Sequence, residues 1–403
     1  MKKILKALEK LDSTSLISIS LFIFLIIYFI FRAFKFTPEA VNELDSLGQH
    51  IPLAESILEG KIFSPPELGN GLGYYMPIGE LILSAFVLLQ IPLGLYNVVA
   101  IIFLFYLCYK LAIRLSLGRN LSIVYAFSIS YLNSVTRLVP TQKNDLWLNV
   151  FFVWVLYLLT KPKKDYKFFL LLGISVGLLV GVKYSGIILA AISLGTLFNN
   201  IKKFLNLKRL MAFSVPVILL GLIWYMRNHV ITSNPFYPVS MFGFRGHPGF
   251  VVPRGYENFL NTKSLILTFQ ALISEYLVWS LLPIYFLVTV LKKKVHKIKE
   301  IKNLLLVGGF STIVYLLGPT DFTRVNITSN MRFLHTAFIV LILATFIIAT
   351  KLKKEREIIM LSILSSVAVL AQFSYYPKLI IIWLIVIAVL FQLKFRNKFG
   401  MTT

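Results

Sequence analysis

The stretch Ser15 to Phe34, SLISISLFIFLIIYFIFRAF, contains twenty residues, of which only Arg32 is charged. Because an α-helix rises about 1.5 Å per residue, such a run can cross the roughly 30 Å hydrocarbon core of a bilayer. The basic stretch Met1 to Asp12 precedes it, and no small-residue cleavage site is apparent. We therefore predict a retained first membrane span rather than a cleaved signal peptide.

Apolar runs of this kind recur along the whole chain. Of its 403 residues, 57% are hydrophobic and only 14% are charged, a balance that a soluble core could not bury. The lone Cys108 provides neither a disulfide framework nor a thiolate metal cluster. The sequence therefore predicts an all-α polytopic membrane protein.

The net charge of +24 is carried largely by short basic loops between the apolar runs. Such loops stay on the cytoplasmic side of a membrane, and anionic lipid headgroups account for them without nucleic acid as a partner. Threading the chain through these loops predicts a cell-membrane protein of about twelve spans with both termini cytoplasmic. The spans are expected at residues 15–34, 97–114, 119–137, 146–161, 167–182, 185–200, 209–226, 265–290, 303–318, 333–350, 356–373 and 378–394.

The run Met76 to Ile91 is also apolar, but a full span there would invert every later basic loop. We therefore expect a helix along the outer membrane face. Pro52 to Gly60 has the apolar spacing of a second short surface helix. The first loop, residues 35–96, is thus predicted to face outward and to contain juxtamembrane helices, with further outer loops at 241–264 and 318–332.

Ionisable side chains gather in these outer loops and at nearby span ends, where a charge close to hydrocarbon is costly and usually has a reason. The first of them lie in NELDSLGQH, residues 42–50, directly after the first span. The residues on this predicted side are Glu43, Asp45, His50, Asp145, Lys183, Arg227 and Arg332.

Carboxylates and cations together suit the transfer of a sugar from a lipid phosphate. The phosphate is the leaving group and needs cations, for which Lys183, Arg227 and Arg332 are candidates. The attacking hydroxyl needs a base, and a carboxylate is usual in glycosyl chemistry. Other interpretations stay open, because Lys183 and Arg227 could snorkel to the interface and Asp145 could cap a helix.

The first 240 residues carry motifs in an order that resembles the GT-C superfamily of membrane glycosyltransferases. Within this superfamily, the motifs resemble those of the group similar to the dolichyl-phosphate-mannose protein mannosyltransferases and the aminoarabinose transferase of lipid A. DSLGQHIPLAESILEGKIF, residues 45–63, matches an acidic residue followed by Gln-His, a proline and a short amphipathic helix. YYMPIGELIL, residues 74–83, matches a Tyr-Pro-Pro motif, with Met76 in place of the first proline.

Three later motifs extend the resemblance. Asn144-Asp145 matches the acidic residue that opens the fourth span, and GVKYSG, residues 181–186, resembles a Gly-x-Lys-Tyr-Thr-Gly turn. WYMRNHVITSNPFYP, residues 224–238, is close to the family's Trp-Tyr-x-Arg-Asn and Gly-Asn-Pro-x-Tyr-Pro segment and is the most specific signal. Beyond residue 250 the likeness is limited to the span pattern and Arg332-Phe333.

The resemblance implies a GT-C-like fold, with a catalytic transmembrane module at 1–240 and a C-terminal transmembrane module at 241–403. It implies a polyprenyl-phosphate monosaccharide donor, inversion at the anomeric carbon, and a lipid, glycan or protein acceptor at the outer membrane face. The implied catalytic residues are Asp45, with Glu43 as the alternative base, and Asp145; the donor-phosphate residues are Lys183, Arg227 and Arg332; the substrate-binding residues are His50, Tyr75, Asn144, Tyr184 and Asn228.

His50 is equally well interpreted as a packed loop residue. The resemblance implies no cofactor, and no spacing in the sequence specifies a metal site, although a divalent metal is left open. The sequence carries no readable code for the sugar, the acceptor or the oligomeric state.

The alternative function is a transporter or flippase for lipid-linked sugars, or a non-catalytic binding subunit. Against a transporter, the polar groups gather on one predicted side rather than at the midplane, and no inverted repeat is visible. A separate pattern concerns structure alone. Gly173, Gly177 and Gly181 recur every four residues and predict a close helix–helix approach.

Overall fold

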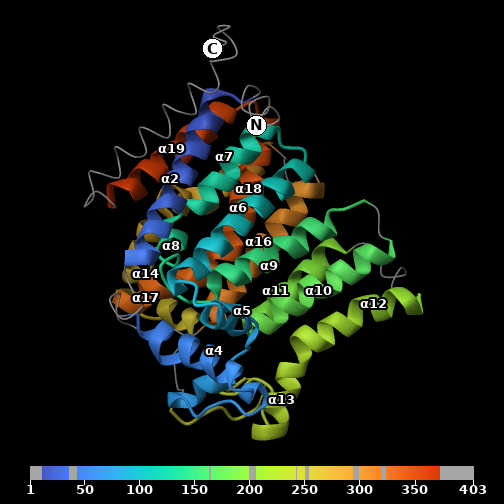
Figure 1. Ribbon diagram of the computed structural model, residues 1–403. Coiled ribbons are helices and arrows are strands. Elements are labelled where there is room, and N and C mark those ends of the chain that lie inside the picture. The colour runs from blue at the N-terminus through green and yellow to red at the C-terminus, as the bar shows by residue number, and fades with distance from the viewer. Residues whose placement is uncertain are drawn as a thin grey trace, which may run out of the picture.

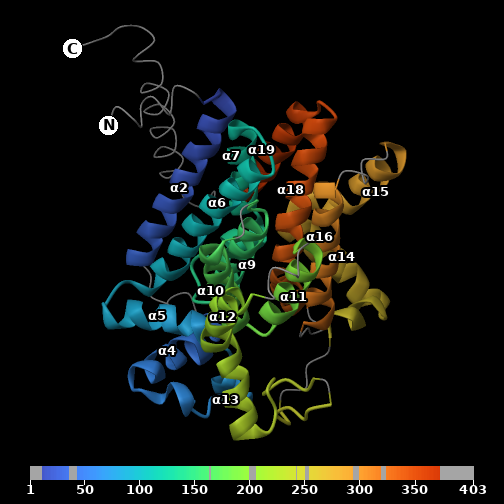
Figure 2. The same ribbon diagram turned by 90° about the vertical axis from the view of Figure 1, so that its right-hand side faces the viewer.

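The computed structural model describes residues 11–35, 43–162, 165–198, 206–241, 243–249, 254–293, 299–318 and 324–372. Across these ranges the protein is helical, and the one β-bridge joins Met241 to Phe244. Figures 1 and 2 show long helices side by side in a bundle, with the short α4, α5 and α13 at one end. The prediction of an all-α protein is confirmed.

Six helical stretches are long and apolar enough to cross a membrane within the described part of the chain. Each overlaps one of the predicted spans, as expected for a multi-pass membrane protein. They are Ser13–Lys35, Leu93–Arg114, Leu207–Thr232, Thr262–Tyr285, Glu300–Leu317 and Val325–Lys351.

Three shorter apolar helices stand where further spans are predicted: α9 (Asp145–Leu159), α10 (Tyr166–Val182) and α11 (Ser185–Leu197). They have 13 to 17 residues. At about 1.5 Å per residue they reach only roughly 20–26 Å. The predicted span 356–373 corresponds to α19 (Glu355–Gln372), and 378–394 lies outside the described residues. The number twelve therefore stays a prediction.

The first loop contains short helices, as predicted. A π-helical turn, η1 (Ser46–His50), runs directly into α4 (Ile51–Leu58). The helix expected within Met76 to Ile91 is α5 (Ile78–Leu88), whose 11 residues cover about 16 Å and are too few to cross a bilayer.

The glycines of α10 allow the close approach that their spacing predicts. They face α12 (Leu207–Val217) and the π-helical turn η6 (Ile218–Leu222). A Cβ atom on Gly173 would lie 2.3 Å from the carbonyl oxygen of Phe213, and one on Gly177 2.6 Å from that of Pro216. Only glycine fits at such distances, so this glycine stripe, Gly173, Gly177 and Gly181, allows α10 to pack closely against α12 and η6.

Pro216 explains the bend that follows α12. Its ring removes a backbone donor from the helix interior, and the π-helical turn η6 comes directly after it. The chain then continues as α13 (Ile223–Thr232), which runs in a different direction from α12 (Figure 1).

The remaining elements complete the bundle and its connections. They are α2 (Ser13–Lys35), η2 (Lys61–Phe63), η3 (Gly69–Tyr74), η4 (Leu93–Leu95), α6 (Tyr96–Arg114), α7 (Arg119–Ser130), α8 (Asn133–Thr136), η7 (Gly255–Phe259), α14 (Thr262–Tyr276), η8 (Leu277–Leu281), α15 (Leu282–Lys293), α16 (Lys299–Leu317), α17 (Arg324–Asn330), η10 (Met331–Leu334) and α18 (His335–Lys351).

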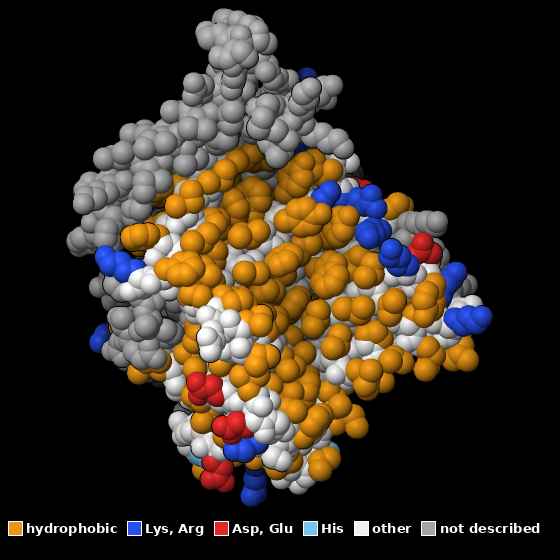
Figure 3. All heavy atoms as spheres, viewed as in Figure 1, with side chains coloured by type: hydrophobic (Ala, Val, Ile, Leu, Met, Phe, Trp, Pro, Cys, Tyr) orange, Lys and Arg blue, Asp and Glu red, His pale blue; other side chains and the backbone are white. Residues whose placement is uncertain are grey.

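The exterior carries a broad apolar surface. Figure 3 shows hydrophobic side chains across the middle of one face, with a group of Lys and Arg side chains toward its upper right and a mixed group of acidic and basic side chains at the bottom. Exposed apolar residues include Phe103 on α6, Leu219 on η6 and Met226 on α13. A continuous surface of this kind fits contact with lipid rather than water.

Candidate functional site

A cavity of about 670 Å³ lies where the first loop, the α10–α11 turn and η10 come together. Its polar lining comes mainly from loops and helix starts. Its apolar lining comes from the bodies of α11 and α16 and from loop residues such as Met76, Phe236 and Met241. The polar residues include Asp45, His50, Lys143, Asn144, Asp145, Lys183, Tyr184, Ser185, Arg254 and Arg332. The apolar ones include Ile187, Ile188, Ala191, Ile192, Ile313, Val314 and Leu317.

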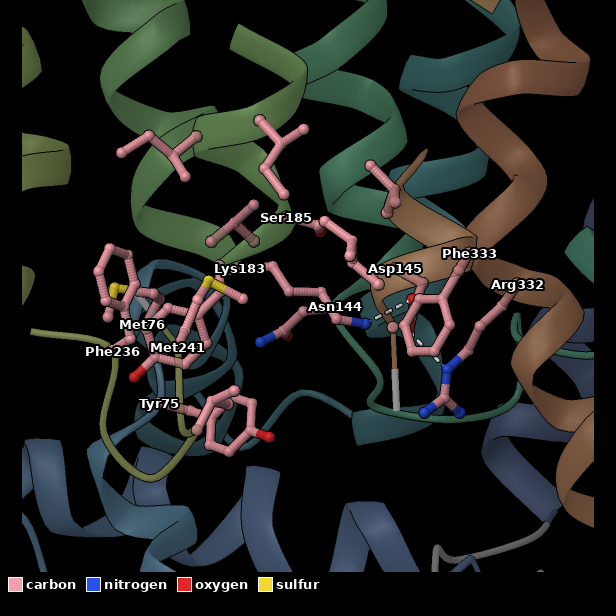
Figure 4. Close-up of a pocket in the computed structure, with 18 of the residues that line it drawn as sticks. Tyr75, Met76, Asn144, Asp145, Lys183, Ser185, Phe236, Met241, Arg332 and Phe333 are labelled. Carbon is pink, nitrogen blue, oxygen red and sulfur yellow. Dashed lines mark hydrogen bonds and ion pairs between the residues drawn. The ribbon is translucent and has the colours of Figure 1, made fainter. Parts of the chain in front are cut away.

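Asp145 is the centre of the charged group. It is the first residue of α9, and its side chain is only 4% exposed. Lys183, in the turn between α10 and α11, places Nζ 2.7 Å from Asp145 Oδ1, and Arg332 Nε lies 3.6 Å from Oδ2. Figure 4 shows the two cations reaching Asp145 from different sides. Phe333 lies beside both, with its ring centroid 4.8 Å from Lys183 Nζ and 5.3 Å from the Arg332 guanidinium carbon.

Asp45 extends the charged group toward solvent. Its Oδ2 lies 3.0 Å from Lys143 Nζ and 3.5 Å from Arg332 Nη1, and its side chain is 44% exposed. Burial raises the pKa of Asp45, but Lys143 and Arg332 more than offset this effect and hold the pKa below its ordinary value. Ion pairs thus link Lys143, Asp45, Arg332, Asp145 and Lys183 in one chain.

Glu43 has a different environment from Asp45. Its Oε1 pairs with Lys143 Nζ at 2.8 Å, and its Oε2 accepts hydrogen bonds from the backbone and hydroxyl of Ser46. The Ser46 hydroxyl in turn accepts from the backbone N–H of Gln142 at 3.0 Å. Glu43 is not among the cavity-lining residues, so its contacts fasten the first loop to the segment before α9.

His50 and Asn144 both contact Glu80, a buried carboxylate that was not among the predicted site residues. His50 Nδ1 lies 2.7 Å from Glu80 Oε1, and Asn144 Nδ2 donates to the same oxygen at 2.8 Å. Tyr96 donates its hydroxyl to Asn144 Oδ1 at 2.7 Å. His50 and Asn144 also line the cavity, so this buried network supports its wall.

Arg227 and Asn228 are placed apart from the charged group and are not among the cavity-lining residues. Arg227 donates to the backbone carbonyls of Ile62 and Tyr74, each at 3.0 Å, and of Tyr75 at 3.2 Å. Its Nε also donates to Asn228 Oδ1 at 3.0 Å. The pair therefore fastens the second half of the first loop to α13.

Tyr75 and Tyr184 line the cavity and contact one another, with ring centroids 5.4 Å apart. The Tyr184 hydroxyl lies within hydrogen-bonding reach of two carbonyl oxygens to which it can donate, those of Tyr74 and Tyr237, and it accepts from Asn228 Nδ2 at 3.0 Å. Burial raises the pKa of Tyr75 well above its ordinary value. These tyrosines therefore present neutral rings rather than charges to the cavity.

Two basic side chains that line the cavity were not predicted from the sequence. Lys143 stands two residues before Asp145, and its position beside a candidate carboxylate was the available signal. Arg254 comes from the outer loop 241–264 and donates to the carbonyl of Ser240 at 2.9 Å. Nothing in its sequence surroundings distinguishes it.

The charges of the cavity lining favour an anionic ligand. Four cations, Lys143, Lys183, Arg254 and Arg332, stand against two carboxylates, Asp45 and Asp145, which leaves an excess of two positive charges. Within the described ranges, no group of three His, Cys, Asp or Glu side chains is arranged to hold a metal ion.

One family of proteins matches part of the chain. It is described as Domain of unknown function (DUF8201), and the match covers residues 82–270. This segment includes Asp145 and Lys183, whereas Asp45 and Arg332 lie outside it. No curated protein and no solved structure matches the chain.

Proposed function

We propose that this protein is a membrane glycosyltransferase that moves a monosaccharide from a polyprenyl-phosphate donor to a lipid, glycan or protein acceptor. The proposal places the site at the outer membrane face of a GT-C-like fold of about twelve spans with both termini cytoplasmic. One observation carries it: the ion-pair chain from Lys143 to Lys183 stands beside a cavity with a long apolar wall. The phosphate of a lipid-linked sugar needs the cations, and its polyprenyl chain needs the apolar wall.

The cations match the charge that develops on the leaving group. A phosphodiester donor carries one negative charge, and the phosphate gains a second as the bond from its oxygen to the sugar breaks. Arg332 Nε is buried and has no hydrogen-bond acceptor within the described residues, since Asp145 Oδ2 lies 3.6 Å away. This unsatisfied N–H group and the Lys183 ammonium are suited to bind the phosphate oxygens and to stabilise the added charge.

The apolar wall suits a polyprenyl chain. α11 begins directly after Tyr184, so Ile188 and Ile192 continue the cavity lining along the helix away from Lys183. Ile192 stands seven positions after Ser185, the first residue of α11, which corresponds to about 10 Å along the helix. Ile313 and Leu317 of α16 supply the facing apolar residues.

Asp45 is suited to accept a hydrogen bond from the acceptor hydroxyl. It is the most exposed carboxylate of the ion-pair chain and lines the cavity. In the proposed reaction the acceptor hydroxyl hydrogen-bonds to Asp45 and attacks the anomeric carbon from the face opposite the phosphate. The acceptor oxygen forms a bond to that carbon as its proton passes to a base at this end of the cavity. The electrons of the breaking bond remain on the phosphate, and attack from the opposite face gives inversion.

The decisive experiment compares wild-type protein with Asp45→Asn in membrane vesicles. The donors are geranylgeranyl phosphate linked to mannose, glucose, galactose or arabinose, and vesicle glycolipids and proteins serve as acceptors. We expect wild type to transfer one of these sugars and to release geranylgeranyl phosphate. Asp45→Asn should lose transfer by about 10²-fold or more and keep donor binding.

The control is Asp165→Asn. Asp165 caps α10 by accepting from the backbone N–H of Phe168, and asparagine caps helices as well as aspartate does. Its activity should equal that of wild type. Donor movement across vesicles without transfer would identify a transporter, and donor binding without either process would identify a binding subunit.

A further inference from the structure

The His50 imidazole is oriented by a fully buried carboxylate. Glu80 has 0% exposed surface, and its Oε1 lies 2.7 Å from His50 Nδ1. If Nδ1 carries the proton that this contact requires, the neutral ring has its lone pair on Nε2. Because His50 lines the cavity, Nε2 is the ring nitrogen left for a ligand there.

Hydrogen bonds and packing hold the Glu80 carboxyl group in place. It lies in the first turn of α5, where the helix dipole stabilises a negative charge, and Asn144 donates to it at 2.8 Å. Asn144 is held by Tyr96 and packs against Gly79, where a Cβ atom would lie 2.1 Å from Asn144 Oδ1. A carboxylate held in this way can fix the tautomer of a histidine and stabilise the imidazolium that forms when the ring accepts a proton.

The π-helical turn η1 brings His50 onto the side of Asp45. Its hydrogen bonds join residues five apart, as the Ile51 N–H to the Ser46 carbonyl shows. The wider turn places residues 45 and 50 near the same side of the chain, and both side chains line the cavity. An ordinary α-helical turn would align residues three or four apart instead.

We propose that His50, positioned by Glu80, accepts the proton of the acceptor hydroxyl in the glycosyl transfer, while Asp45 orients that hydroxyl. This inference rests on the proposed function. The O–H bond breaks as the new bond from oxygen to the anomeric carbon forms, and the proton moves to His50 Nε2. The electrons of the broken bond to the sugar remain on the lipid phosphate, and the imidazolium then releases its proton to water. Asp45 is less suited to keep a proton because Lys143 and Arg332 stabilise its ionised form.

The test uses the full-length protein, the same four geranylgeranyl phosphate donors and the vesicle acceptors. We expect His50→Ala to lower kcat by about 10²-fold or more with less than a twofold change in donor affinity. Added imidazole should restore part of the lost rate, because it can occupy the vacated space and accept the proton. Glu80→Gln should lower kcat less than His50→Ala does and leave KM near its wild-type value.

The matched control is His229→Ala, which removes an exposed histidine of α13 that does not line the cavity. Its kcat should stay within twofold of wild type, with or without imidazole. Thermal melting of each variant identifies losses that come from unfolding, and Glu80→Gln tests the proposal even if His50→Ala does not fold.

The outcomes separate the two proposals. If wild type transfers sugar, Asp45→Asn does not, and His50→Ala retains its rate, the role of His50 is overturned and the glycosyltransferase stands. A lost rate that imidazole does not restore, accompanied by equal loss of donor binding, would likewise reduce His50 to a packing residue. If wild type releases no geranylgeranyl phosphate from any donor, the proposed function is wrong, and the proposed role of His50 is wrong with it.

Discussion

Lys183 Nζ lies 2.7 Å from Asp145 Oδ1, although the two residues are 38 positions apart in the chain. Asp145 begins α9 and Lys183 follows the last residue of α10, so two helix ends meet through this pair. Burial lowers the pKa of Lys183, whereas Asp145 opposes that shift. The buried ammonium of Lys183 and the buried carboxylate of Asp145 therefore stabilise one another's charged form.

Removing one member of this pair should destabilise the fold more than removing both. Asp145→Leu leaves Lys183 and Arg332 without a shared carboxylate, and we expect it to cost about 3 kcal/mol of unfolding free energy. Asp145→Leu combined with Lys183→Met should cost less than the single change. Unfolding in detergent, followed by tryptophan fluorescence, measures both.

Lys61→Met is the control for that comparison, because Lys61 and Glu59 form an ion pair in which both side chains are more than half exposed. Exposed pairs contribute only about 0–1 kcal/mol. A control loss as large as that of Asp145→Leu would contradict the importance of the buried pair.

The pH dependence of transfer should reflect the cations around Asp45. A carboxyl group whose pKa is lowered stays ionised as the pH falls through its ordinary range, so the contribution of ionised Asp45 to the rate should be lost only below that range. Lys143→Met removes a cation 3.0 Å away and should move this acidic limb to higher pH. The rate of sugar transfer as a function of pH measures the shift. An unmoved limb would assign it to another group.

Arg227→Ala should weaken the fold without weakening the donor site. It removes hydrogen bonds to the carbonyls of Ile62, Tyr74 and Tyr75, and bonds from a charged donor are worth about 1.5–3 kcal/mol each. We therefore expect a lower melting temperature and an unchanged Kd for the donor in the fraction that remains folded. Arg332→Ala is the comparison and should raise that Kd at least tenfold. Equal effects on Kd would support the phosphate-binding role that the sequence motif implies for Arg227.

The sequence predicted those parts of the fold that depend on periodicity and length. Long apolar runs such as Ser13–Lys35 gave helices because twenty or more such residues have few other stable arrangements in a membrane. The glycines of α10 predicted a close approach because their spacing places them on one helix face. The partner helix, α12, was not predicted, since packing between helices depends on contacts distant in sequence.

For the site, topology placed Asp45, Asp145, Lys183 and Arg332 on one predicted side, and the structure brings their side chains together. Lys143 was missed because a lysine in a loop usually has only solvent as its neighbour. Glu80 appeared in the sequence only as one residue of a juxtamembrane motif. Its role depends on three-dimensional contacts with His50 and Asn144 that spacing does not encode.

The glycine stripe should give opposite results at two similar positions. Gly177→Ala places a methyl group 2.6 Å from the carbonyl oxygen of Pro216 and should cost about 1–3 kcal/mol, because the backbones of α10 and α12 must separate. Gly195→Ala in α11 meets nothing within 4 Å and should gain up to about 1 kcal/mol from helix propensity. Melting of the two purified variants measures the difference. Destabilisation by both would show that the loss does not come from the helix contact.

Ala191→Trp should block the apolar part of the cavity and leave the charged part intact. Ala191 lines the cavity from α11, between Ile188 and Ile192, where the proposed lipid chain would lie. Wild type should bind geranylgeranyl phosphate more tightly than geranyl phosphate, since the longer chain buries more apolar surface. Ala191→Trp should abolish that preference, whereas Ile102→Trp, on the exposed surface of α6, should preserve it. If Ala191→Trp binds both lipids as wild type does, the polyprenyl chain lies elsewhere and the apolar wall has another use.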